Sequence, residues 1–258
     1  EAETGQRLLY SYAGNADPAH YGLTQPSITV EVDAGRSDFA PANPAAGRYA
    51  INASDLQGVG LVLGVLKEID LYDWFRRREP LATLGGSVFV YDVAAQTPGE
   101  WVAHCAAPGR LLADAEAERL VGRAGLRHVT FDCQSSWVFP GETPGWYVLP
   151  PGETWIEEWA GANGPEVVYR HRANAYGPDY AIAYWPGGEP FLCPKGIDSC
   201  ADGWRHYEGE SGGAAELRGY GARGAEWATV WRVAQATAAP LSVQGHLLGA
   251  DGARQVAD

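Results

Sequence analysis

One short segment near the middle of the chain alternates acidic and aromatic side chains: Glu153, Trp155, Glu157 and Trp159. If residues 153–159 form a strand, all four lie on one face, because successive side chains of a strand point to opposite faces. Indole rings pack against apolar CH surfaces such as those of sugar rings, and glycoside cleavage requires positioned carboxylates. The pattern predicts a glycan-binding strip in which Glu157 is the catalytic carboxylate and Trp155 and Trp159 hold the sugar.

The two carboxylates of this strip are too far apart to act as a pair. The Cα atoms of Glu153 and Glu157 would lie roughly 13 Å apart at ~3.3 Å per residue. The carboxyl groups of a retaining pair are about 5–5.5 Å apart, so a second carboxylate is expected from another strand. The candidates for it are Glu166, Asp179 and Glu226. The competing interpretation is an edge strand whose charges prevent aggregation while its indoles cover the rim of the core.

A second candidate site lies shortly after the strip. On a strand, Tyr169 and His171 share one face, and both are able to act as acid or base in eliminative cleavage of a uronate polymer. An arginine would neutralise the uronate carboxylate, but Arg170 and Arg172 point to the opposite face. The competing interpretation is a packed face opposite an ion-pairing face. Two aromatic residues of the next predicted strand extend either interpretation as binding residues: Tyr180 and Tyr184.

The four cysteines indicate disulfides rather than a metal site. They are Cys105, Cys133, Cys193 and Cys200, with no CxxC motif and no histidine at zinc-ligand spacing. Of the three possible pairings we favour Cys105–Cys133 and Cys193–Cys200, because residues close in sequence meet more readily. Disulfides in turn indicate an oxidising compartment.

Further features favour a secreted protein. The chain contains no Met and begins Glu1-Ala2-Glu3, and we expect its first five residues to remain from a removed secretion leader. Asn52-Ala53-Ser54 is an N-glycosylation sequon. No apolar run reaches the ~18 residues of a membrane span. We therefore expect a secreted, monomeric glycoprotein that does not enter a membrane.

Charge and missing motifs exclude several functions. The net charge is −13, from 32 acidic and 19 basic residues, so nucleic acids and anionic membranes would be repelled. P-loop, GxSxG, HExxH and EF-hand motifs are absent from the sequence. The six histidines are scattered without an HxH pair, so neither a metal nor a cofactor is predicted, although ligands can still converge from distant strands.

The composition and pattern predict a mainly β fold. Glycines, prolines and aromatic residues are frequent, and runs of alternating polarity are separated by turn residues. Strands are predicted at 8–12, 27–32, 87–93, 126–133, 146–149, 154–159, 166–172, 180–184 and 226–233. The best helix is at 114–122, with Asp114 as its N-cap. Residues 56–78 are ambiguous. A possible capping box at Ser54 and Gln57 favours a helix, whereas the glycines that follow favour a strand at 59–65 and a short helix near 69–77. The Gly-rich stretch 208–224 is predicted to be a loop.

These elements indicate an antiparallel β-sandwich or jelly-roll-like fold with one or two short helices, as a single domain over 1–258. The leading functional hypothesis is a secreted glycoside hydrolase that cleaves a polysaccharide by carboxylate acid–base catalysis, without a cofactor. A lectin-like glycan-binding protein without catalysis is the first alternative. A Tyr/His polysaccharide lyase and a secreted toxin or effector are the others.

Overall fold

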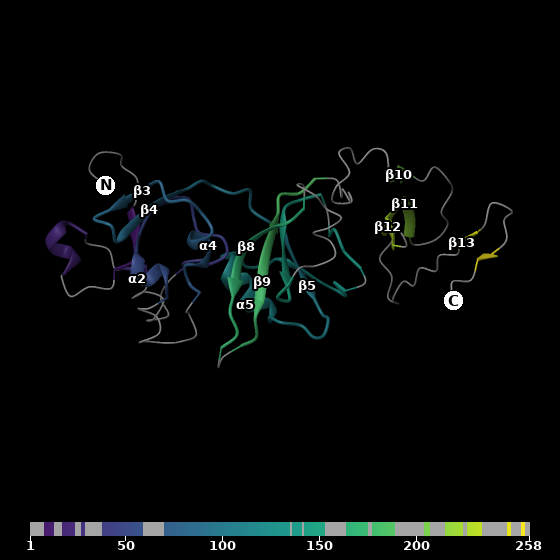
Figure 1. Cartoon of the computed structure of the whole chain (residues 1–258), viewed down its shortest axis with the longest axis horizontal. Coiled ribbons are helices and arrows are strands. Elements are labelled where there is room, and N and C mark those ends of the chain that lie inside the picture. The colour runs from purple at the N-terminus through teal and green to yellow at the C-terminus, as the bar shows by residue number, and fades with distance from the viewer. Residues whose placement is uncertain are drawn as a thin grey trace. The chain divides into compact units, whose positions relative to one another are not determined.

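The computed structural model divides the chain into two compact units, Glu1–Lys195 and Gly196–Asp258. It describes residues 8–12, 17–23, 27–28, 38–58, 70–134, 136–140, 142–152, 164–174 and 177–188 of the first unit. In the second unit it describes the backbone of five strands (Figure 1). The expectation of one domain over the whole chain stays a prediction.

The described part of the first unit contains two β-sheets. The four-stranded sheet has the order β1-β2-β4-β3, with β1 Leu8–Tyr10, β2 Gly47–Asn52, β3 Ala82–Leu84 and β4 Val88–Val93. The five-stranded sheet has the order β6-β5-β7-β9-β8, with β5 Trp101–Cys105, β6 Arg127–Phe131, β7 Gly145–Leu149, β8 Glu166–His171 and β9 Tyr180–Trp185. The described helices are short: 3-10 helix η1 Pro18–Tyr21 and α-helices α2 Ala53–Leu56, α4 Asp73–Arg76 and α5 Asp114–Val121.

The predicted fold class is confirmed: the protein is mainly β, its sheets are mostly antiparallel, and the arrangement is consistent with a β-sandwich. Three strand pairs are nevertheless parallel: β1 with β2, β5 with β6, and β5 with β7. Parallel neighbours need a crossover connection, and α5 lies in the connection from β5 to β6. This β5–α5–β6 unit positions the histidines described below.

The helix α5 ends as the sequence predicts, at Gly122 in the left-handed conformation (φ 67°). Its start differs, because Ala113 is the N-cap and Asp114 is the first helical residue. The Asp114 carboxylate makes no capping bond and contacts Arg110 and His128 instead. The N-cap prediction for Asp114 was therefore wrong, and its side chain is available for other contacts.

The central strands of the five-stranded sheet, β5, β7 and β9, are buried on both faces. On β5, Val102 belongs to a large core cluster with residues of α5 and of the four-stranded sheet. Its neighbours Trp101, Ala103 and Cys105 belong to a second cluster, which Trp137, Val138 and Phe139 cover. Every residue of β5 is buried, so the strand lacks the alternation of polarity by which strands are recognised in a sequence.

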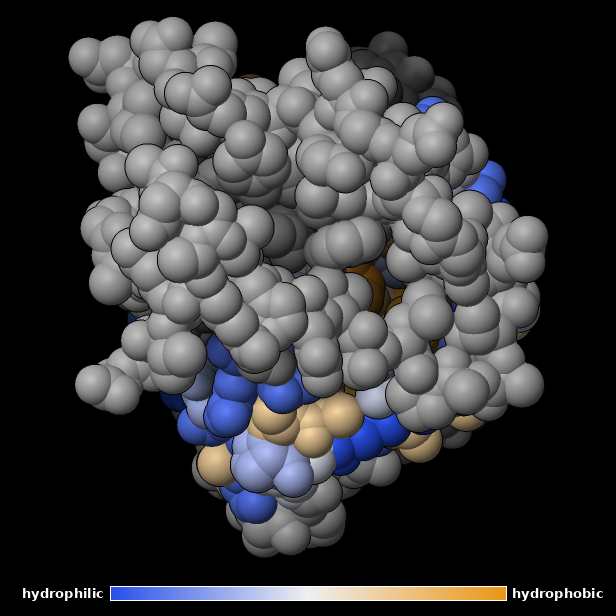
Figure 2. All heavy atoms as spheres, turned by 90° about the vertical axis from the view of Figure 1, so that its right-hand side faces the viewer, coloured by the Kyte–Doolittle hydropathy of each residue, from blue (hydrophilic) through white to orange (hydrophobic). Residues whose placement is uncertain are grey.

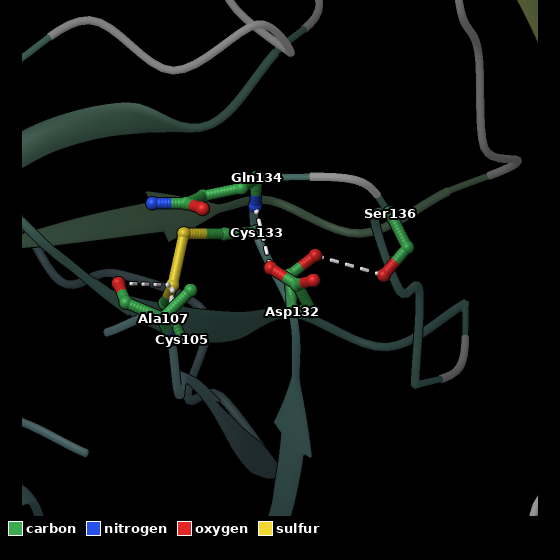
Figure 3. The surroundings of a disulfide bond; sticks show 6 residues. All are labelled: Cys105, Ala107, Asp132, Cys133, Gln134 and Ser136. Atoms are coloured by element: carbon green, nitrogen blue, oxygen red, sulfur yellow. Dashed lines mark hydrogen bonds between the residues drawn. A yellow bond between two sulfur atoms is a disulfide. The ribbon is translucent and has the colours of Figure 1, made fainter. Parts of the chain in front are cut away.

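A disulfide joins Cys105, the last residue of β5, to Cys133, which lies just beyond β6 (Figure 3). Beside it, Asp132 accepts hydrogen bonds from Gln134 N at 3.0 Å and from Ser136 Oγ at 2.9 Å. The predicted Cys105–Cys133 pair is confirmed. The other predicted pair, Cys193–Cys200, lies outside the described residues.

The ambiguous segment is resolved at its two ends. Asn52 caps α2 by accepting a hydrogen bond from Ser54 N at 2.9 Å, so the capping box predicted at Ser54 was wrong by two residues. The short helix predicted near 69–77 is confirmed as α4. The strand predicted at 59–65 lies outside the described residues, as does most of the strand predicted at 27–32.

The second unit contains a three-stranded antiparallel sheet of β10 Trp204–His206, β11 Ala215–Arg223 and β12 Glu226–Val233. Strands β13 Leu247–Leu248 and β14 Arg254–Gln255 form a separate pair. The prediction of a loop at 208–224 was wrong for β11. Its ladder with β12 includes two glycines, Gly219 and Gly221, and shifts register between Leu217 and Gly219.

Among the residues that the structure describes, no helix is long and apolar enough to cross a bilayer. Where described residues appear on the face drawn in Figure 2, hydrophilic side chains surround a few apolar ones. That part of the surface therefore shows no extended apolar patch.

Candidate functional site

The residues predicted to bind and cleave a glycan fall on different parts of the chain. The strip of Glu153, Trp155, Glu157 and Trp159 lies outside the described residues. Of the predicted partners, Glu226 lies at the start of β12 in the second unit. Asp179 accepts a hydrogen bond from Ala173 N and so closes the turn between β8 and β9, which is a structural role.

Glu166, at the start of β8, is exposed and contacts Arg78 at 3.4 Å. The Arg78 guanidinium lies over the indole of Trp74, 3.5 Å from the ring centroid, and donates to the Trp74 carbonyl oxygen at 2.9 Å. This stack connects the predicted carboxylate to a hollow that the sequence did not reveal.

That hollow has a volume of about 380 Å³. We call it the Trp74 hollow, and it is lined by Trp74, Arg78, Glu79, Leu81, Tyr91 and Asp92. Its volume lies within the ~300–1,000 Å³ of small-molecule sites. Leu81 is 62% exposed and gives the hollow an accessible apolar wall, while Arg78, Glu79 and Asp92 provide polar groups.

Electrostatics fix the state of two groups in the Trp74 hollow. The two hydrogen bonds that Asp92 accepts from Arg48, at 2.8 and 3.0 Å, hold the pKa of Asp92 below its usual value. Burial, and then the charge of Glu79, raise the pKa of Tyr91. At neutral pH the hollow therefore presents an ionised carboxylate at Asp92 and a neutral phenol at Tyr91.

The second predicted site is partly assembled. His171 and Tyr180 stack with ring centroids 4.8 Å apart, and Tyr169 lies 6.2 Å from Tyr180. All three line a hollow of about 90 Å³ together with Arg119 of α5. Its volume is well below the range of ligand pockets, so it leaves no room for a sugar ring. Tyr184 is not among its lining residues: it packs on Trp146 and donates to the Thr97 carbonyl oxygen at 2.9 Å.

A buried carboxylate explains one arginine of this segment, Arg172. Asp70 is 1% exposed and accepts hydrogen bonds from Arg76 Nη2 at 2.8 Å, Arg172 Nε at 2.8 Å and Arg172 N at 2.7 Å. Asp73 similarly accepts from Arg170 N at 2.7 Å. These bonds attach the segment around α4 to β8, so the Arg172 side chain has a structural role here.

A third group of side chains is brought together by the β5–α5–β6 unit. His104 Nε2 lies 2.9 Å from His128 Nδ1, and the Asp114 carboxylate lies 2.9 Å from His128 Nδ1 and 3.6 Å from His104 Nε2. We call His104, Asp114 and His128 the histidine cluster. On its outer side, Glu118 Oε1 lies 3.3 Å from His128 Nε2, and Arg110 contacts Asp114.

Burial sets the charge of the innermost member. His104 is fully buried, and this burial, together with the nearby Arg110 and His128, lowers the pKa of His104 to about 4. Hydrogen bonds from Leu126 N and from His128 lower the pKa of Glu118. At neutral pH the cluster thus contains a neutral imidazole at His104, with an ionised Glu118 beside it.

Sequence spacing hid this cluster because 24 residues separate the two histidines. A β–α–β unit predicted over 101–131 would have revealed the cluster, since the parallel strands place His104 and His128 on one face of the sheet. The sequence pattern predicts no strand at 101–105, and therefore no such unit.

No protein-family model, curated protein or solved structure matches this chain.

Proposed function

We propose that this is a secreted carbohydrate-active protein that holds a sugar ring of a neutral glycan in the Trp74 hollow and cleaves the glycan by carboxylate acid–base catalysis. The observation that carries the proposal is the hollow itself. Its size suits one or two sugar rings, and it combines an exposed apolar wall at Leu81 with charged planar groups at Arg78 and Asp92. Such groups form paired hydrogen bonds with neighbouring hydroxyls.

Charge favours a neutral glycan over an acidic one. The chain carries a net charge of −13, and the hollow contains Glu79 and Asp92, with Glu166 next to Arg78. A polymer of uronates would be repelled by this field. The lyase hypothesis, which requires such a polymer, is therefore less favoured than hydrolysis. The Cys105–Cys133 disulfide is in keeping with secretion into an oxidising compartment.

Binding is tested by titrating a panel of neutral oligosaccharides with paired variants. Leu81→Ala removes the apolar wall of the hollow, whereas Leu84→Ala removes a similarly exposed leucine that does not line it. Arg78→Ala and Arg77→Ala form a second pair, because only Arg78 lines the hollow. We expect Leu81→Ala and Arg78→Ala to weaken binding about fivefold or more, and both controls to bind like the wild type. Equal affinities within each pair would exclude the hollow as the glycan site.

Cleavage is tested separately, by measuring new reducing ends. Glu157 is the proposed catalytic carboxylate, as the alternating strip predicts. Glu157→Gln should lower turnover by about 10²-fold or more and leave binding intact, because general acid–base catalysis contributes roughly that factor. Binding without any turnover in the wild type would instead identify a lectin. Unimpaired turnover in Glu157→Gln would exclude Glu157 as the acid or base.

A further inference from the structure

The histidine cluster is independent of the glycan proposal and has features of its own to explain. Val102 on β5 lies opposite His128 on β6, so His104 and His128 project from the same face of the sheet. Helix α5 packs on that face through Ala117 and Leu120. The first residue of that helix, Asp114, thereby meets both imidazole rings.

The three ligand atoms lie close to the spacing of a metal site. They are separated by 2.9, 2.9 and 3.6 Å. Ligands at about 2.1 Å from a tetrahedral Zn²⁺ lie about 3.4 Å from one another. Shifts of a few tenths of an ångström would thus place all three atoms around one ion.

Hydrogen bonds account for only part of this arrangement. If the proton of His128 is on Nε2, it is donated to Glu118, and the Nδ1 lone pair then faces the Asp114 carboxylate at 2.9 Å. Arg110 contacts that carboxylate and reduces the repulsion. A metal ion at the centre of the cluster would bind the lone pair and the carboxylate together.

The burial of His104 favours the metal ion. His104 is 0% exposed, and its Nδ1 has no hydrogen-bond partner among the described residues. Burying a polar ring is unfavourable unless its nitrogens are bonded. A bond from Nε2 to a metal ion would offset part of that cost, although it leaves Nδ1 unpaired within the part of the chain that the structure describes.

The surroundings suit an ion that is open on one side. Exposure of the side chains rises from 0% at His104 to 16% at His128 and 52% at Asp114, so the cluster runs from the core to the surface. Three protein ligands with solvent on the remaining side is the arrangement of an exchangeable metal position. Glu118, held by Leu126 N at 2.9 Å, would orient His128 from behind, as outer carboxylates do for metal-bound histidines.

We propose that the histidine cluster binds one divalent transition-metal ion of the Zn²⁺ type, through His104 Nε2, His128 Nδ1 and the Asp114 carboxylate. Two imidazoles with a single carboxylate select Zn²⁺ and its transition-metal neighbours over Mg²⁺ and Ca²⁺, which prefer oxygen ligands throughout. Arg110 neutralises Asp114 at the same oxygen and therefore competes with the ion for it.

The test is a titration of the metal-free full-length protein with Zn²⁺ at pH 7.5, followed by calorimetry, with Co²⁺ absorption as a second probe. We expect one ion per chain with micromolar or tighter affinity, and no competition from Mg²⁺ or Ca²⁺. His128→Ala and Asp114→Asn should each weaken binding at least tenfold. His20→Ala, which removes an exposed histidine from η1, should leave the affinity unchanged.

Arg110→Ala separates a built site from casual binding by surface histidines. Removing a competing positive charge beside Asp114 should tighten Zn²⁺ binding by about tenfold at this short range.

Because His104→Gln alters a buried residue, circular dichroism first has to show that this variant folds. Nitrogen-15 spectra of the histidine rings then report His104 and His128 directly, and each should shift at the stated nitrogen on adding Zn²⁺. The proposal is overturned by absence of Zn²⁺ binding, by affinity insensitive to His128 and Asp114, or by ring spectra that Zn²⁺ leaves unchanged.

Discussion

Two glycines of the first unit lie directly against buried indole rings. Gly145 of β7 is paired with Trp101 of β5, and a Cβ atom at position 145 would lie 2.2 Å from the Trp101 ring. A Cβ atom at Gly99 would lie 2.3 Å from the ring of Trp146. Trp101 is fully buried and its Nε1 donates to the Thr143 carbonyl oxygen at 2.9 Å, so the ring is fixed in place. The absence of a side chain at position 145 is thus a packing requirement.

Gly145→Ala should destabilise the protein by about 2–3 kcal/mol, because the added methyl group must displace a ring that has no free space around it. The measurement is the free energy of unfolding in urea. Gly109→Ala is the matched control, since a Cβ atom there meets nothing within 4 Å. A midpoint for Gly145→Ala equal to that of the control would show that the Trp101 ring is free to move aside.

Two aspartates illustrate how burial changes the value of an ion pair. Asp70 is 1% exposed and bonded to Arg76 and Arg172, whereas Asp92 is 50% exposed and bonded to Arg48 at 2.8 Å. Water screens the exposed ion pair of Asp92 strongly and the buried ion pairs of Asp70 only weakly. The two carboxylates accept similar hydrogen bonds but differ in how far solvent can replace a lost partner.

We therefore expect Asp70→Asn to cost about 3 kcal/mol of unfolding free energy, since two guanidinium groups lose their buried counter-charge. Asp92→Asn should cost much less, because water screens that exposed pair. Urea unfolding of both variants in parallel measures the difference. Similar losses in the two variants would contradict the assignment of Asp70 as the link between the α4 segment and β8.

At the scale of elements, α5 ends at a glycine for two separable reasons. Gly122 has a φ of 67°, and a Cβ atom there would also lie 2.7 Å from Ala40 Cβ. Gly125 has a similar φ of 73°, but a Cβ atom there meets nothing within 4 Å. Substituting Gly125 thus tests backbone strain alone, whereas substituting Gly122 tests backbone strain together with a steric contact.

Gly125→Ala should cost about 1 kcal/mol, the usual penalty for a left-handed residue with a side chain. Gly122→Ala should cost about 1–2 kcal/mol more, because the methyl group also meets Ala40 where α5 packs. Thermal unfolding of the two variants measures both terms. An equal loss in both would mean that the segment around Ala40 yields to the new methyl group.

Local sequence patterns predicted the elements that are rich in strand-forming residues or have clear ends. Strands β4 and β8 contain runs of valine and aromatic residues, and α5 carries acidic residues at its start and glycine at its end, so each was predicted within about two residues. Strand β5 is buried on both faces, and β11 is rich in glycine, so neither shows a period of two. The same limit applies to sites. Pairing between distant strands assembles the histidine cluster, and no local spacing records that pairing.

At the scale of the whole molecule, the Cys105–Cys133 disulfide closes the β5–α5–β6 segment that forms the histidine cluster. The disulfide joins residues 28 apart, and the segment between them contains α5 and β6. Cys105 directly follows His104 in β5, and Cys133 lies two residues after the end of β6. The bond therefore restrains the two strands that carry the cluster's histidines, at the edge of the five-stranded sheet.

Replacing Cys105 and Cys133 together by serine should cost about 3–4 kcal/mol of unfolding free energy, as the chain-entropy model gives for a loop of this length. The predicted Cys193–Cys200 pair closes a much shorter loop, so Cys193→Ser with Cys200→Ser should cost only about 2 kcal/mol. Urea unfolding of both double variants measures the two values. Mass mapping of unreduced peptides identifies the bonds themselves and should recover both pairs without a free thiol.

A peptide linking Cys105 to Cys193, or a 105–133 variant as stable as the wild type, would contradict this account. If the bond also holds β5 against β6, its loss should weaken Zn²⁺ binding at the histidine cluster, while the shorter-loop variant binds normally.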